Sequence, residues 1–135
     1  MICVLLLFCS FIVQGDVAPD HSVQVAQFDA PAIVLLAHNY LDGRFFSDIE
    51  IGNYIHYETG GEWTDYKVVD IRTFEALQPD SIFTQLFDGL NVYSPQKIHE
   101  QIFNDPDTLV LQTCIYNNNR LNWGRLFVVA ERQWQ

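Results

Sequence analysis

Short runs of β-branched and aromatic residues, separated by turn-forming residues, recur along this 135-residue chain and most strongly limit how it can fold. We expect strands at residues 32–37 (AIVLLA), 53–58 (NYIHYE), 63–74 (WTDYKVVDIRTF), 108–115 (TLVLQTCI) and 125–131 (RLFVVAE). Several of these runs are close enough in sequence to pair as hairpins. The pattern therefore predicts a small, mostly antiparallel β-barrel.

Turn and helix signals punctuate the middle of the chain. Residues 59–62 (TGGE) separate two predicted strands as a hairpin turn. Ser94 and Pro95 fit a helix N-cap followed by proline at the first helical position, and they open a short helix. We expect residues 40–49 to form a loop or a short helical turn and residues 75–93 to be irregular. The barrel should therefore carry one or two short helices.

The first 13 residues are apolar, and Ser10 is the clearly polar residue among them. A membrane-spanning helix needs roughly 20 apolar residues, whereas this run has the length of the apolar region of a signal peptide. We expect residues 1–15 to be a signal segment, residues 16–31 a linker or leading strand, and residues 32–135 the folded domain. This predicts export to the outer face of the membrane or the cell wall. A membrane tether through this segment, or a buried edge strand, remains an alternative.

The charge of the chain limits its partners. The sequence holds 17 acidic and 7 basic residues, which gives a net charge of −10. Nucleic acid is excluded as a partner, because binding it requires Lys and Arg to replace counterions. The acidic surface is compatible with a cationic partner such as an amine-bearing substrate, or with a purely solvating role.

The cysteines single out one thiol. Cys3 and Cys9 lie in the apolar N-terminal segment, so the folded domain keeps Cys114 as its lone cysteine. One cysteine cannot form an internal disulfide, and a lone thiol in an exported domain is a candidate for chemistry. The alternative is a small buried hydrophobic residue at a strand end, which is common for a free cysteine.

Residues 116–124 (YNNNRLNWG) are predicted to form a polar loop, and the hairpin that contains it brings this thiol to an arginine. If its loop closes symmetrically, Ile115 pairs with Gly124 and Cys114 pairs with Arg125, and directly opposed residues have Cβ atoms about 4.5–5.5 Å apart. A neighbouring cation favours the thiolate, which is the attacking form. A guanidinium can also donate hydrogen bonds to an oxyanion. A loop one residue longer or shorter would break this register.

Four histidines could supply the proton that a leaving amine needs near neutral pH. His21 lies in the polar segment before the first strand, His56 lies within a strand, and His99 lies on the short helix. His38 follows directly after an apolar strand, where side chains at the rim of a barrel reach a site. His38 is therefore the candidate acid and base.

Three stretches of the sequence together resemble the sortase family. They are residues 35–39 (LLAHN), residues 109–114 (LVLQTC) and residues 123–130 (WGRLFVVA). The order is Ala-His after an apolar strand, Thr-Cys at the end of a late strand, and Arg opening the terminal strand. The resemblance implies a small closed eight-stranded sortase-like β-barrel. It also implies that residues 32–135 form a catalytic domain.

The resemblance implies a cysteine transpeptidase with Cys114 as nucleophile, His38 as acid and base, and Arg125 as the residue that steadies the oxyanion or orients the substrate. The substrate would be a sorting-signal peptide, often of Leu-Pro-x-Thr-Gly type, which is released from a Cys thioester by an amine. That amine would come from a cell-wall precursor or from a lysine of a protein subunit. No cofactor is expected, and the histidines show no spacing typical of a metal site.

Two alternatives stay open. Arg120 is a rival to Arg125 for the arginine role, although it lies in the predicted loop. The chain could also be a non-catalytic exported β-barrel binding module, derived from a sortase with a truncated barrel. Papain-like peptidases are disfavoured, because they place the cysteine before the histidine, and no histidine follows Cys114.

Overall fold

The structure is a computed structural model, and it describes residues 23–25, 30–76, 82–85 and 91–134. The predicted signal segment at residues 1–15 and most of the predicted linker at residues 16–31 lie outside these residues. The proposed division of the chain at those boundaries therefore stays a prediction.

The elements that precede the predicted nucleophile form a series of strands interrupted by two short helices. They are β1 (Gln24–Val25), β2 (Ile33–Leu36), the 3-10 helix η1 (Asp42–Asp48), β3 (Tyr54–Thr59), β4 (Glu62–Glu75), β5 (Phe83–Gln85), β6 (Val92–Tyr93) and α2 (Pro95–Ile102). The last two strands are β7 (Thr108–Asn117) and β8 (Arg120–Arg132). The predicted strands and both predicted helical segments are confirmed. The region predicted to be irregular contains the two shortest late strands, β5 and β6, which have too few residues to show a strand pattern.

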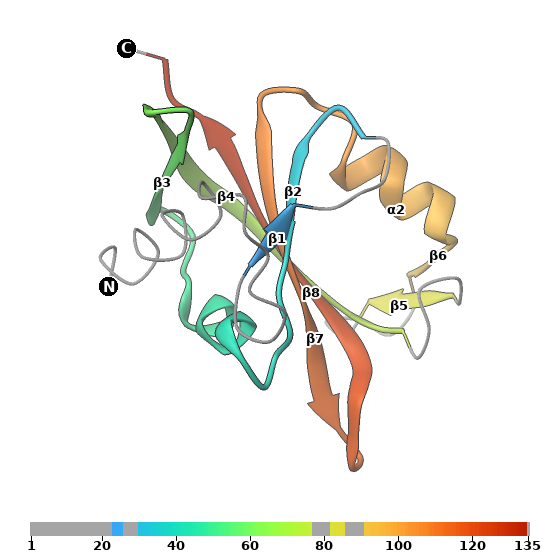
Figure 1. The fold of residues 1–135 in the computed structure, drawn as a ribbon. Coiled ribbons are helices and arrows are strands. Elements are labelled where there is room, and N and C mark those ends of the chain that lie inside the picture. Colours follow the sequence, from blue (N-terminus) through green and yellow to red (C-terminus); the bar gives the residue numbers. More distant parts are fainter. Residues whose placement is uncertain (1–22, 26–29, 77–81, 86–90, 135) are drawn as a thin grey trace.

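The strands of the described residues form one eight-stranded sheet in the order β1-β2-β7-β8-β4-β5-β6, with β3 also paired to β4. Only the β2–β7 pairing is parallel among the described pairs. The sheet is curled into a half-barrel, and α2 lies beside it (Figure 1). The predicted mostly β fold, with eight strands and one or two short helices, is thus confirmed.

Both faces of the central strands are covered, which explains why the runs in β2, β7 and β8 are continuously apolar rather than alternating. One face packs with Phe46 of η1 and Ile55 of β3, and the other packs with Ile98 of α2. Successive residues of β8 divide between the two clusters, since Phe127 belongs to the second and Val128 to the first. The sheet is therefore held between two hydrophobic cores.

The β7–β8 hairpin closes more tightly than the sequence suggested. Asn118 and Asn119 have φ values of 49° and 59°, as the two central residues of a type I′ turn require. The expectation that residues 116–124 form a loop was wrong, because this two-residue turn lets both strands continue to it. Asn117 pairs with Arg120, and the end of the hairpin extends beyond the body of the sheet (Figure 1).

The register of this hairpin agrees with the prediction. Cys114 pairs with Arg125, and Ile115 pairs with Gly124. A register shift between Ile115 and Asn117 takes up the additional residues of β8. This register shift lies between Ile115 and the turn. The pairing of Cys114 with Arg125 is therefore the one that symmetric closure of the predicted loop gives.

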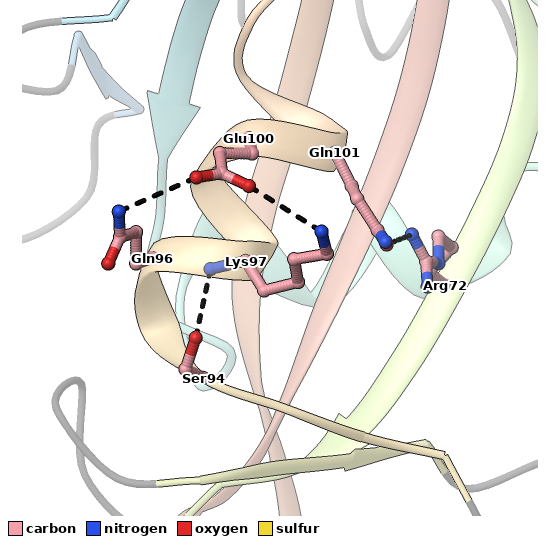
Figure 2. Close-up of polar contacts among 6 residues, drawn as sticks. All are labelled: Arg72, Ser94, Gln96, Lys97, Glu100 and Gln101. Atoms are coloured by element: carbon pink, nitrogen blue, oxygen red, sulfur yellow. Dashed lines mark hydrogen bonds and ion pairs between the residues drawn. The ribbon is translucent and has the colours of Figure 1, made fainter.

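The helix α2 begins at the N-cap serine and the proline that the sequence predicted. The Ser94 Oγ accepts a hydrogen bond from the Lys97 backbone N–H at 3.1 Å, and Pro95 opens the helix (Figure 2). Figure 2 also shows Gln101 of α2 in contact with Arg72 of β4, where the Arg72 Nη1 donates to the Gln101 Oε1 at 3.2 Å. The helix is thus fixed to the sheet at its polar side as well as through its buried isoleucines.

Candidate active site

The chain that follows β2 runs alongside the end of β7. Leu36 pairs with Gln112 in parallel register, and the Ala37 backbone N–H donates to the Gln112 carbonyl at 3.1 Å. His38 lies two residues after Leu36, and Cys114 lies two residues after Gln112. The parallel register therefore brings the His38 backbone to the level of Cys114 at the end of the sheet.

The backbone on either side of His38 is held by hydrogen bonds. The buried Thr113 hydroxyl donates to the Ala37 carbonyl at 2.7 Å. The His38 carbonyl accepts from the Leu41 and Gly43 N–H groups, each at 3.0 Å. Thr113 precedes the candidate nucleophile directly, so it links the strand of the thiol to the segment of the imidazole. The sequence showed the Thr-Cys pair, but it did not predict that the Thr113 hydroxyl would bind the backbone next to His38.

Gly43 occupies a place where no side chain fits. A Cβ at this position would contact the Thr113 hydroxyl, the His38 carbonyl oxygen at 2.7 Å and the Ala37 carbonyl oxygen at 2.8 Å. Real Cβ atoms essentially never approach an oxygen this closely. A small residue is therefore required where η1 meets the two strand ends.

Gly43→Ala is expected to destabilise the fold by about 1–3 kcal/mol, the usual range for overpacking a tight site. Urea denaturation followed by circular dichroism would measure the loss. Ser47→Ala is the matched control, because Ser47 is an exposed residue of the same helix and should cost less than about 0.5 kcal/mol. Equal stability of the two variants would contradict the close packing at Gly43.

The His38 side chain is exposed and stacks on Tyr40, with ring centroids 5.1 Å apart and planes at 20°. Its neighbour Asn39 donates from Nδ2 to the Leu121 carbonyl at 2.9 Å, which ties this segment to β8. The imidazole is therefore open to solvent at the same end of the sheet as the thiol. An exposed imidazole can exchange protons with a bound substrate or with water.

Cys114 is a free, half-buried cysteine. It lines a cavity of about 250 Å³ together with residues of η1 and the neighbouring strand ends. Its partial exposure differs from the fully buried position that the alternative expected. The Cys114 side chain shares a face of the β7–β8 pairing with its partner Arg125, whereas Thr113 and Ile115 face the other side.

Arg125 is buried, with 5% of its surface exposed. Its Nη1 donates to the Ala76 carbonyl at 2.9 Å, the Asn122 carbonyl at 3.0 Å and the Gly124 carbonyl at 2.9 Å. No carboxylate of the described residues forms an ion pair with it. The guanidinium is thus held in place by backbone carbonyl groups. It lines a second cavity of about 260 Å³, beneath α2.

Among the other candidates of the described residues, only His99 lines one of the two cavities. The His56 Nδ1 lies 2.6 Å from the Asp65 Oδ1, in hydrogen-bond contact across the β3–β4 pairing. His99 of α2 packs edge-to-face on Phe103 at 5.6 Å and lines the Arg125 cavity, a position that sequence reasoning did not anticipate. Arg120 is exposed beside the hairpin turn. His21 lies outside the described residues.

Two kinds of feature are absent from the described residues. No cluster of three His, Cys, Asp or Glu residues among them could hold a metal ion. Within the same residues, neither helix has the length and apolar character needed to cross a bilayer.

Comparison with solved structures shows that the chain has a sortase-like fold. It is similar to Streptococcus agalactiae sortase C1 in complex with MTSET, with a TM-score of 0.57 and 17% identity over 84% of this chain and 54% of that one. The Actinomyces oris sortase C-1 gives 0.55 and 17% over 84% and 57%. Clostridium perfringens sortase C with the C-terminal cell wall sorting motif gives 0.54 and 21% over 84% and 56%.

These identities are low, so the similarity establishes the fold. The chain spans just over half the length of the solved sortases that it matches. No protein-family model matches the sequence, and no curated protein matches it at a significant level.

Proposed function

We propose that this chain is a sortase-like cysteine transpeptidase that acts at the cell surface. Cys114 is the nucleophile, His38 the general acid and base, and Arg125 the group that stabilises the oxyanion. The observation that supports this most is the strand register at the end of the sheet. Cys114 is paired with Arg125 on β8, and β2 lies in parallel on the other side of β7 and delivers His38 to the same level.

In the first half of the reaction, the Cys114 thiolate attacks the carbonyl carbon of a peptide bond in a sorting signal. Negative charge develops on the carbonyl oxygen, and the Arg125 guanidinium, which has no counterion among the described residues, offsets that charge. The C–N bond breaks, and the departing amine takes a proton from the His38 imidazolium. The products are a thioester on Cys114 and a free amine.

In the second half, an acceptor amine attacks the thioester carbonyl. His38 takes the proton from the attacking nitrogen, the C–S bond breaks, and the thiolate of Cys114 is restored. The acceptor is a cell-wall amine or a lysine of a protein subunit. The sortase C structure that contains a cell wall sorting motif supports a peptide of this kind as the acyl donor.

Intact-mass spectrometry tests the proposal. The wild-type protein, incubated with a Leu-Pro-x-Thr-Gly peptide, should gain the mass of the acyl fragment on Cys114. It should lose that mass when an amine is added. Peptide mapping locates the adduct. The absence of any adduct with a panel of sorting-signal peptides would contradict the proposed activity.

A non-catalytic binding module is the second candidate. It is favoured by the curl of the described sheet into a half-barrel, which leaves the barrel open (Figure 1). A module of this kind would bind a sorting-signal peptide with similar affinity in the wild-type and Cys114→Ala proteins, and neither protein would form a thioester. The two candidates therefore give opposite results in the same mass measurement.

A further inference from the structure

Alternation along β2 assigns the His38 side chain to one face of the sheet. Leu35 belongs to the hydrophobic cluster that packs with η1, and Leu36 packs against the cluster of α2. Ala37 returns to the cluster of η1, and its N–H still bonds to β7. Because successive side chains of extended backbone point to opposite faces, His38 follows Leu36 on the face of α2.

The thiol lies on the same face. Phe127 belongs to the cluster that packs with α2, and it pairs with Gln112. Cys114 and Arg125 form the next pair on this face, two residues further along each strand. The imidazole and the thiol therefore lie on one face at the same end of the sheet, as proton transfer at the thiol's substrate requires.

One ring contact orients the imidazole. The chain turns directly after His38, where the His38 carbonyl accepts from the Leu41 and Gly43 N–H groups, and Tyr40 lies within this turn. The Tyr40 ring stacks on the imidazole, with centroids 5.1 Å apart and planes at 20°. No described side chain forms a hydrogen bond or an ion pair with the imidazole. Among the described residues, the stack with Tyr40 is therefore what restrains it.

We propose that Tyr40 is a positioning residue, which holds the His38 imidazole in the orientation that proton transfer needs. The inference rests on the proposed transpeptidase function. An exposed histidine otherwise samples several staggered rotamers, and a general acid works only when its N–H points at the leaving nitrogen. A stacked aromatic pair favours one orientation by about twofold to twelvefold. Tyr40 itself gains or loses no proton in either half-reaction.

Cleavage of a fluorogenic sorting-signal peptide tests the inference. Tyr40→Ala should lower kcat about fivefold, within the range that the stack supplies, and should leave KM within about twofold. Tyr40→Phe keeps the ring without the hydroxyl and should restore the rate to within about twofold of the wild type. Tyr54→Ala is the matched control, because it removes an exposed tyrosine of β3 and should keep the wild-type rate.

A donor that needs no proton separates positioning from a structural effect. The same acyl peptide is offered as a nitrophenyl ester, whose nitrophenolate leaves without protonation. In single turnover, Tyr40→Ala should then form the Cys114 thioester within about twofold of the wild-type rate. A fivefold loss with both donors would overturn the inference, because Tyr40 would then act on something other than the proton that His38 donates.

A double variant measures whether the two rings act as one unit. In the His38→Ala background, removal of the Tyr40 ring should cause no further loss of peptide cleavage, because the orientation of the imidazole is then irrelevant. A second fivefold loss in that background would also overturn the inference.

The failure of this inference can be told from that of the proposed function. The ring current of a stacked tyrosine moves the proton signals of the His38 imidazole upfield in NMR spectra. Tyr40→Ala should return them toward the positions of free histidine, and Tyr40→Phe should not. A wild type that forms the thioester, with a Tyr40→Ala variant as active as it is, refutes the inference alone. With no thioester in the wild type, the transpeptidase proposal fails, and imidazole signals that are alike in the wild type and Tyr40→Ala would remove the positioning contact as well.

Discussion

Cys114→Ala is expected to abolish both thioester formation and transfer, with the rate of donor cleavage falling by at least about a thousandfold. The thiolate is the group that forms the covalent intermediate, and alanine leaves no nucleophile at the paired ends of β7 and β8. Cleavage of a fluorogenic sorting-signal peptide measures the rate. The double variant Cys3→Ser/Cys9→Ser is the control and should keep full activity.

The partners of the thiol should show smaller, graded losses. His38→Ala should lower the rate by about a hundredfold or more, because it removes the proton donor for the leaving amine. Arg125→Lys keeps the charge and loses the planar fork, so a loss of about a hundredfold is expected. If the Cys114→Ala protein cleaved the peptide at the wild-type rate, the nucleophile would have to lie elsewhere.

Phe127→Ala is expected to destabilise the domain by about 3–5 kcal/mol, a large part of the roughly 5–15 kcal/mol that stabilises a domain. Phe127 is 1% exposed, and its ring lies 5.8 Å from the rings of both Phe74 and Phe103. It joins β8 to β4 and to the end of α2, and it lines the Arg125 cavity. Truncation would enlarge that cavity and remove the ring contact with Phe103, the residue that caps the end of α2.

Urea denaturation of the wild type, Phe127→Ala and Phe127→Leu would measure this effect. The leucine variant keeps most of the buried volume and should lose less than about 1.5 kcal/mol. Tyr116→Ala, which removes an exposed aromatic residue, should have little effect. A loss below about 1 kcal/mol for Phe127→Ala would show that the aromatic cluster is not the core of this face.

The strands and the hairpin register were predictable because the signals are local. Apolar runs mark β2, β7 and β8. The pairing of Cys114 with Arg125 follows from the number of residues between them, once symmetric closure of the loop is assumed. The tight turn was missed, because Asn118 and Asn119 were read as part of a polar loop although both tolerate positive φ. The register survived this error because the irregularity lies between Ile115 and the turn.

The junction around His38 could not be predicted in the same way. The contacts of Thr113 and Gly43 depend on the parallel pairing of β2 with β7, which joins residues 76 positions apart. No local pattern specifies which strand lies beside which. The stacking of His38 on Tyr40 and the position of His99 at the Arg125 cavity likewise follow from tertiary packing.

The parallel β2–β7 pairing has a consequence for the order in which the domain forms. The β7–β8 hairpin closes through two residues and should fold early, whereas β2 must find β7 across most of the chain and should dock late. We therefore expect β7–β8 amides to gain hydrogen-exchange protection before those of β2, and simultaneous protection would refute this order. A nascent chain would then carry a thiol without its proton carrier, so reactivity would arise only in molecules that have completed folding.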